Sequence, residues 1–337
     1  MEEIILKKIT LSVLDLSVVS EGDSVADAIK RTVEVARHTE KLGYKRLWLA
    51  EHHNMEHIAS SATAVLIGHV AELTEGEIRV GSGGIMLPNH SPLVVAEQFG
   101  TLASIYPNRI DLGLGRAPGT DQLTAAALRR NNNVHHYDFK TEIEQLQTYF
   151  SIENKNAKVR AFPGEGVNVP IWILGSSTDS AYLAAQMGLP YAFAAHFAPA
   201  QFKMAIDIYR KNFQPSKHLQ KPYVLACVNV IAADTDKEAE LLSTSLYRVF
   251  VGIITNMRMP LQAPAPLPAI INHPEIQQAL QTMLSCTFIG SKQTLKKIIP
   301  AFIEETNIDE LMVSTHIYDK AAKLKSYSIL YDTLNEA

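Results

Sequence analysis

Short β-branched and apolar runs alternate with longer amphipathic stretches along most of this chain. Eight of the short runs have the length and composition of strands. They cover residues 9–14, 46–49, 78–81, 110–114, 171–174, 191–194, 223–232 and 310–314. Strands that alternate with helices form parallel sheets, so the pattern predicts an α/β protein.

The stretches between these runs repeat apolar residues at helical spacing. They predict helices over residues 24–42, 61–72, 92–105, 137–150, 177–187, 199–213, 235–255, 291–305 and 320–334. Ser24 and Asp27 have the spacing of a capping box at the start of the first helix, and Gly43 marks its end. Gly188 marks the end of the helix at 177–187 in the same way. Residues 115–136 have no clear period and are expected to be irregular or partly helical.

The number of strand and helix units favours one architecture over another. Eight such units in 337 residues predict a (β/α)8 TIM barrel with insertions, forming a single domain over residues 1–337. An open, doubly wound sheet is the alternative. The segment 259–275 is rich in proline and apolar residues, and it precedes the last barrel unit. It is either a lid over the site or a surface excursion.

Composition removes several classes of function. Hydrophobic residues make up 47% and charged residues 20% of the chain, as in ordinary soluble proteins. The net charge of −4 disfavours a broad nucleic-acid surface. No run of about 18 apolar residues predicts a membrane span. The first residues do not resemble a signal peptide, and Cys227 lies in an apolar run. We therefore expect a cytoplasmic protein without a disulfide framework.

Candidate chemistry gathers where the predicted strands end. A TIM barrel brings these positions to one rim, at its C-terminal face, where ligands bind. In chain order they are Glu51, His52 and His53 after the second strand, Gly83 and Gly84 after the third, Arg116 after the fourth, Gly175, Ser176 and Ser177 after the fifth, His196 after the sixth and His316 after the eighth.

One part of this rim has the composition of a phosphate site. Gly175 and the two serines after it precede a predicted helix, whose first N–H groups can bind an anion. Ser177 and Ser180 add hydroxyl donors, and Arg116 adds a planar fork of N–H groups. The competing interpretation is that a serine only caps the helix.

Two other motifs are weaker. The glycines at 113–115 lack Rossmann spacing, because Pro118 stands where the third glycine belongs. Residues 53–57 match the metal-binding pattern H-x-x-E-H, which requires a helix, yet they follow directly on a strand. We therefore predict no metal at this position. His135 and His136 are expected to be solvated loop residues.

With these residues in view, the chain resembles the bacterial luciferase-like flavin monooxygenase family. The matching pieces are AEHHN at 50–54, GSGGIMLPNHSPLVVAEQFGTL at 81–102, IDLGLGRAPGTDQ at 110–122 and ILGSS at 173–177. The likeness extends from about Lys8 to the terminal helix. It points to a branch other than the light-emitting subunits, because Gly115 stands where luciferase has a reactive cysteine.

The resemblance implies a TIM barrel that binds reduced FMN, and it assigns roles to individual residues. It implies a non-prolyl cis peptide at Gly83–Gly84, beneath the flavin ring. Arg116, Ser177 and Ser180 match the family's phosphate-binding positions, with Gly175 and Ser176 beside them. His52 matches an active-site histidine proposed as a base near the flavin C4a atom, and His53 is its neighbour.

The resemblance also implies a reaction and its partners. A separate flavin reductase would supply reduced FMN, and O2 would form a C4a-peroxyflavin that oxidises a small, apolar organic substrate. Relatives often form homodimers through helices that correspond to residues 61–72 and 92–105. The segment 259–275 would then shield the reaction from water.

Two alternatives remain at this level. One is an F420-dependent oxidoreductase that transfers hydride, for which the longer anionic tail requires further basic residues such as Arg129 and Arg130. The other is a flavin-binding relative without catalysis. The presence of His52, Arg116 and the serines argues against this second alternative.

Overall fold

Nine parallel strands form the centre of the computed structural model, which describes residues 9–128 and 138–335. Each strand lies within or close to a run of buried apolar residues. The strands are β1 (Thr10–Asp15), β2 (Arg46–Leu49), β3 (Arg79–Met86), β4 (Ile110–Gly115), β5 (Ile171–Gly175), β6 (Tyr191–Phe193), β7 (Val224–Ala233), β8 (Thr287–Ser291) and β9 (Glu310–Ser314).

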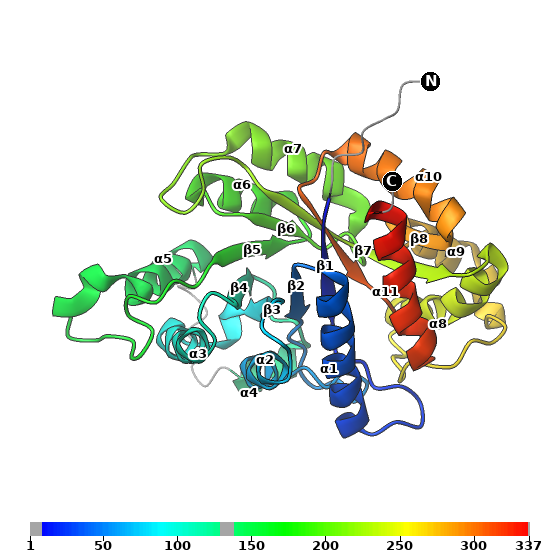
Figure 1. Ribbon diagram of the computed structural model, residues 1–337, viewed down its shortest axis with the longest axis horizontal. Helices are drawn as coiled ribbons and strands as arrows, with labels where there is room; N and C mark the ends of the chain where they lie inside the picture. The colour runs from blue at the N-terminus through cyan, green and yellow to red at the C-terminus, as the bar shows by residue number, and fades with distance from the viewer. Residues whose placement is uncertain (1–8, 129–137, 336–337) are drawn as a thin grey trace.

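Eight of these strands close into a barrel. Neighbours pair in chain order from β1 to β6, after which β6 pairs with β7, β7 with β9, and β9 with β1. Helices surround this barrel (Figure 1). The predicted TIM barrel is therefore confirmed, and an open sheet is excluded because β6–β7 and β1–β9 pairing leaves the ring without an edge.

The helices follow the predicted order with small shifts at their ends. They are α1 (Val25–Leu42), α2 (Thr63–Glu72), α3 (Pro92–Ile105), α4 (Gln122–Leu128), α5 (Phe139–Phe150), α6 (Thr178–Met187), α7 (Phe202–Asn212), α8 (Asp236–Ile254), α9 (Pro274–Met283), α10 (Lys292–Thr306) and α11 (Lys320–Asn335). The capping box of Ser24 and Asp27 is present, and Gly43 and Gly188 end their helices with φ of 89° and 58°. None of the helices in the described ranges is long and apolar enough to cross a bilayer.

Two elements differ from the sequence-based expectation. Strand β8 and helix α9 were not predicted. β8 pairs with the C-terminal half of β7, from Asn229 to Ala233, so this strand pair extends beyond the closed ring. In addition, β3 continues five residues past its predicted end at Gly81, and Gly83 and Gly84 therefore lie within the strand.

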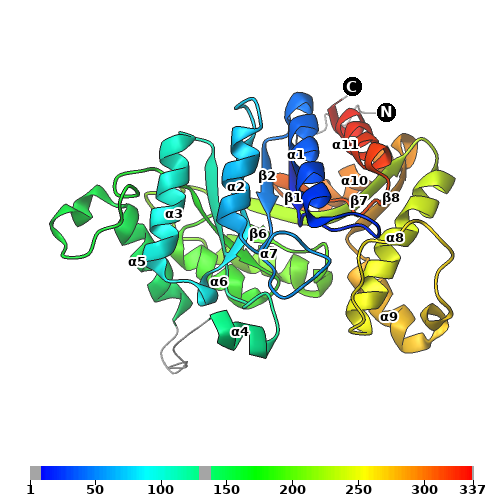
Figure 2. The same ribbon diagram turned by 90° about the horizontal axis from the view of Figure 1, so that it is seen from below.

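Two apolar clusters position the site. Inside the barrel, Leu14, Trp48, Trp172 and Cys227 lie in one buried cluster with residues of β6 and β9. Cys227 is a buried free thiol, as expected. A second cluster lies between the β7–β8 extension and helices α8 and α9, which lie together on the opposite side of the barrel from α2 and α3 (Figure 2).

The segment 259–275 lies along α8 and reaches the rim of the barrel. Arg248 of α8 donates to the side chain of Gln262 and to the carbonyl oxygen of Pro266. Leu261 is buried and forms a bridge with Ser20, in the loop after β1. This segment therefore joins α8 to the loops at the C-terminal ends of the strands.

Candidate active site at the C-terminal end of the barrel

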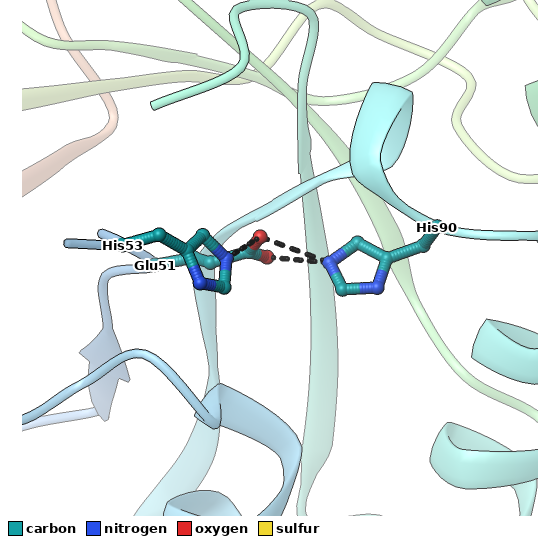
Figure 3. A group of neighbouring side chains, drawn as sticks. All are labelled: Glu51, His53 and His90. Atoms are coloured by element: carbon teal, nitrogen blue, oxygen red, sulfur yellow. Dashed lines mark hydrogen bonds and ion pairs between the residues drawn. The ribbon is translucent and has the colours of Figure 1, made fainter. Parts of the chain in front are cut away.

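The carboxylate of Glu51 connects the loop after β2 with the end of β3 and the loop that follows it, at the C-terminal rim. This side chain is 1% exposed, and it accepts hydrogen bonds from Nε2 of His53 at 2.8 Å and Nε2 of His90 at 2.9 Å (Figure 3). It also accepts from the backbone N–H of Met86 at 2.9 Å and the amide of Asn89 at 3.3 Å. Glu51 thus fixes the end of β2 against the end of β3.

Charge and donor number explain why Glu51 is ionised. Burial acts to raise the pKa of this carboxyl group, but the bonds from His90, His53 and Met86 outweigh it and hold the pKa below its usual range. The ligand atoms of Glu51, His53 and His90 lie within 4.8 Å of one another, close enough for a metal ion. The hydrogen bonds already account for this proximity, and residues 53–57 form a loop rather than the helix that H-x-x-E-H requires.

His52 follows Glu51 and belongs to the same loop. Its Nδ1 donates to the carbonyl oxygen of Gly119 at 3.3 Å, which leaves the lone pair of the neutral ring on Nε2. Burial lowers the pKa of His52, and Arg258 lowers it further, against the opposing effect of the Gly119 bond. His52 is therefore a neutral proton acceptor near pH 7.

Glycines line the rim beside His52. The peptide bond between Gly83 and Gly84 is cis, as the resemblance implied. A Cβ on Gly83 would lie 2.8 Å from Leu14 Cδ1, and one on Gly84 would lie 2.8 Å from the carbonyl oxygen of Gly113. A side chain at Gly84 would meet the backbone of β4, so only glycine fits there, whereas at Gly83 the end of the Leu14 side chain would have to move. The end of β3 therefore packs its backbone closely against β1 and β4.

Two of the predicted phosphate residues line one cavity. Arg116 and Ser180 line a cavity of about 400 Å³ together with Lys140 and Asp179, and α5 supplies its other wall. Arg116 is half exposed, and in the described part of the chain its guanidinium group pairs with the carboxylate of Asp179, at 3.3 Å. Ser177 is the N-cap residue of α6, but its side chain makes no capping bond. Ser176 lies beside it in the same turn and is partly buried.

Ser180 and Gly175 contribute in a way that the sequence did not indicate. The hydroxyl of Ser180 bonds inward, to the carbonyl oxygen of Ser177 at 2.7 Å and to the hydroxyl of Tyr191 at 2.9 Å. A Cβ on Gly175 would lie 1.8 Å from that hydroxyl oxygen. Gly175 therefore makes room for Ser180, and Ser180 fixes the turn before α6.

Two further histidines face the mouth of the barrel. Burial lowers the pKa of His196 to about 3, with additional effects of His316 and His52. Burial also lowers the pKa of His316 to about 4, and Lys323 adds to this effect. All three rings are thus uncharged near pH 7. Arg129, Arg130, His135 and His136 lie outside the described residues.

Sequence reasoning missed several contributors to this rim. Asn89 and His90 lie 38 and 39 positions from Glu51, and Asn229 lies 33 positions from His196, so no local spacing relates them. Lys140 begins a helix, and nothing in its neighbourhood indicates a ligand. For Asn229, the available signal was that a polar residue interrupts the apolar run of β7.

Comparison with known proteins identifies the family. The model of the luciferase-like monooxygenase family matches residues 9–279. The chain belongs to this family. A luciferase-like monooxygenase of Escherichia coli (strain K12) is 46% identical over 330 residues, covering 98% of both chains. The uncharacterized protein YvbT of Bacillus subtilis (strain 168) is 50% identical over 97% of both chains.

Other relatives extend the range of chemistry in the family. The N-acetyl-S-alkylcysteine monooxygenase of Bacillus subtilis (strain 168) is 31% identical over 97% of this chain and 98% of its own. Among solved structures, apo-MsnO8 is 32% identical, with a TM-score of 0.87 and 98% coverage of both chains. The family membership supports an oxidoreductase of the monooxygenase type.

More distant structures share the fold and differ in cofactor. The oxygenating constituent of 3,6-diketocamphane monooxygenase, in complex with FMN, has a TM-score of 0.71 at 17% identity and covers 97% of this chain and 98% of its own. An F420-dependent secondary alcohol dehydrogenase has a TM-score of 0.67 at 15% identity and covers 98% of this chain and all of its own, 100%. The barrel thus occurs with either cofactor.

Proposed function

We propose that this protein is a monooxygenase that uses reduced FMN, supplied by a separate flavin reductase, to oxidise a small organic substrate with O2. The observation that carries the proposal is the cavity at the start of α6. There Arg116 and Lys140 line the same cavity as the first turn of α6. This combination of two cations with the positive end of a helix dipole suits a phosphate monoester.

The charges of the cavity favour FMN over F420. Its described lining contains two cations, Arg116 and Lys140, and two acidic residues, Asp138 and Asp179. The acidic residues would repel a long tail of several anionic groups, whereas a single phosphate can bind to Arg116 and the helix N-terminus. The two alternatives are therefore an F420-dependent enzyme and a flavin-binding protein without catalysis, and the experiments below distinguish them from the proposed function.

The residues of the rim have distinct tasks in this proposal. Bound reduced FMN supplies the electrons for oxygen activation. Arg116, Ser176 and Ser177 hold the phosphate, and Gly83 and Gly84 offer flat backbone to the ring. Nε2 of His52 accepts or returns a proton, while the Glu51 contacts to His53 and His90 hold the loop that carries His52.

The surroundings suggest the remaining features. The apolar barrel interior suits a largely apolar substrate, and the segment 259–275 is placed to act as a lid that excludes water. Exposed Val65, Val94 and Ile105 lie on the adjacent helices α2 and α3, which we propose as a homodimer interface. We further propose a cytoplasmic protein that forms one domain over residues 1–337.

An anaerobic titration tests this function. The purified protein is titrated with reduced FMN and, in parallel, with reduced F420, and binding is followed by absorbance and fluorescence. Saturable binding of reduced FMN, followed by delayed reoxidation when air is admitted, is the expected result. Binding of reduced F420 alone would indicate a hydride-transferring enzyme instead. Binding of neither reduced FMN nor reduced F420 would contradict the proposal.

A variant separates catalysis from binding. His52→Ala is expected to bind reduced FMN with wild-type affinity and to lose most of its oxygenation of a substrate that the wild type accepts. His57→Ala, a histidine of the same loop that we assign no role, is the control. Unchanged turnover in His52→Ala would remove the role given to this imidazole.

A further inference from the structure

Two buried polar atoms at the barrel mouth have no hydrogen-bond partner among the residues that the structure describes. Asn229 is 1% exposed and its Oδ1 accepts no hydrogen bond, and Nδ1 of His196 is also buried without a partner. A buried acceptor without a partner costs about 1–3 kcal/mol, so such atoms are rare unless water or a ligand meets them. These two atoms lie on neighbouring elements.

The direction of the Asn229 side chain is fixed by its donors. Its Nδ2 donates to the carbonyl oxygen of His196 at 2.5 Å and to Oγ1 of Thr287 at 3.2 Å. Exchanging the two amide atoms would place Oδ1 against that carbonyl oxygen, which cannot donate. The unpartnered atom of Asn229 is therefore its oxygen, an acceptor.

The register of β7 places this oxygen on the inner face of the barrel. Leu225 and Cys227 belong to the cluster inside the barrel, and Asn229 follows at the same two-residue spacing. His196 comes three residues after the end of β6, and His316 and His52 are close enough to contribute to the lowering of its pKa. His196 and Asn229 therefore face the mouth that also contains His52.

We propose that His196 and Asn229 form a substrate subsite that holds a neutral hydrogen-bonding group, with an amide as the class that fits it best. This inference rests on the proposed function and names the class of its substrate. An amide N–H donates to Oδ1 of Asn229. The second polar atom of the amide pairs with Nδ1 of His196, which can donate or accept according to its tautomer.

The same chemistry rejects a carboxylate at this position. Oδ1 of Asn229 repels an anion, and the imidazoles around it are uncharged near pH 7. Transfer of an unpaired carboxylate into such surroundings is strongly unfavourable. The subsite therefore selects between two groups of nearly equal size.

Matched ligands test this selection directly. Hexanamide, hexanoate and 1-hexanol are titrated into the full-length protein and its variants at pH 7.5. Affinities are measured by isothermal titration calorimetry, and the position of binding in the wild type is followed by NMR of 15N-labelled histidine side chains. The His196 signals are assigned by their loss in His196→Asn. We expect hexanamide to shift these signals and to bind at least tenfold more tightly than hexanoate, with 1-hexanol between them.

Two substitutions remove the subsite and one retains it. Asn229→Leu and His196→Phe are each expected to weaken hexanamide binding about tenfold, which is roughly the value of one hydrogen bond to a buried amide. His196→Asn keeps a polar atom near the position of Nδ1 and should retain most of the affinity. Asn212→Leu, on the surface of α7, is the control and should bind as the wild type does.

Three results would overturn the subsite. They are equal affinity for hexanamide and hexanoate, absence of hexanamide binding up to its solubility, and unchanged binding in both Asn229→Leu and His196→Phe. If Asn229→Leu does not fold, His196→Phe alone decides. Because these titrations need no flavin, failure of the subsite is distinct from failure of reduced FMN to bind.

Discussion

The two ends of the barrel both contain polar side chains, but they use them in opposite ways. At the N-terminal end, Arg46 bonds to Asp111 at 2.6 Å and to Glu310 at 2.7 Å, and Arg79 bonds to Asp111 at 2.6 Å. Tyr223 donates to Glu310 at 2.9 Å. Every one of these charges has an opposite charge beside it.

At the C-terminal end, polar groups remain available. Arg116 contacts one exposed carboxylate, the Ser177 hydroxyl makes no capping bond, and atoms of His196 and Asn229 have no protein partner. In this protein, the structural network differs from the candidate binding site in whether its polar groups have protein partners, rather than in how polar it is. The N-terminal network should therefore affect stability, and the C-terminal rim should affect ligands.

The largest expected effect lies in the N-terminal network. Asp111→Asn removes the charge between Arg46 and Arg79, and we expect the free energy of unfolding to fall by about 3–5 kcal/mol, because a buried charge then lacks its partner. Urea denaturation measures the change. Glu305→Gln, which breaks the exposed pair with Lys203, should cost less than about 1 kcal/mol. Equal losses in both variants would contradict the comparison.

The next effect belongs to the rim and should leave stability almost unchanged. Arg116→Ala removes a charged donor from the cavity, and we expect reduced FMN to bind about 10–100-fold more weakly, the equivalent of a hydrogen bond from a charged group. The free energy of unfolding should change by less than about 0.5 kcal/mol. Lys203→Ala is the matched surface control. Wild-type affinity in Arg116→Ala would place the phosphate elsewhere.

Glu51 belongs to the rim but is saturated like the N-terminal network, so it sharpens the comparison. Glu51→Gln turns one acceptor oxygen toward the histidines into a donor, and we expect a loss of about 1–3 kcal/mol in unfolding free energy. Turnover should also fall, because the loop that carries His52 loses its anchor. Reduced FMN affinity, measured on the folded fraction, should change only a few-fold. A stable variant with full turnover would show that Glu51 is dispensable.

The smallest expected effect is a change in the free energy of unfolding with pH. The pKa of His316 is about 4 in the folded protein, below that of an unfolded histidine, so the unfolded chain binds the proton first as the pH falls. Stability should decline by up to about 1.4 kcal/mol per pH unit between about pH 6.5 and pH 4. Urea denaturation of wild type and His316→Asn at several pH values measures this. An equal slope in both would contradict the burial of an uncharged His316.

Most of the fold was predictable because local signals agree with it. Ser24, Asp27, Gly43 and Gly188 mark helix ends by backbone chemistry that acts over a few residues. Strand β8 was missed because it is only five residues long and follows a proline-rich segment and the short helix α9, which the sequence pattern did not predict either.

The position of the candidate residues in the fold was predictable, and their contacts were less so. The barrel places every strand end at one rim, so the order of the strands predicted that His52, Arg116 and Ser177 lie there. The partners of Glu51 and the inward bond of Ser180 depend on how distant loops pack, and sequence spacing does not describe that packing. Asn229 stands out as a polar residue in an apolar strand, but its partners could not be predicted for the same reason.

A crystal structure of the complex with FMN tests the central claim most directly. The account predicts the phosphate within hydrogen-bonding distance of Arg116 and the turn at Ser176 and Ser177, with the flavin ring over Gly83 and Gly84 and beside Nε2 of His52. A flavin bound outside this rim, or a phosphate that contacts neither Arg116 nor the start of α6, would contradict it.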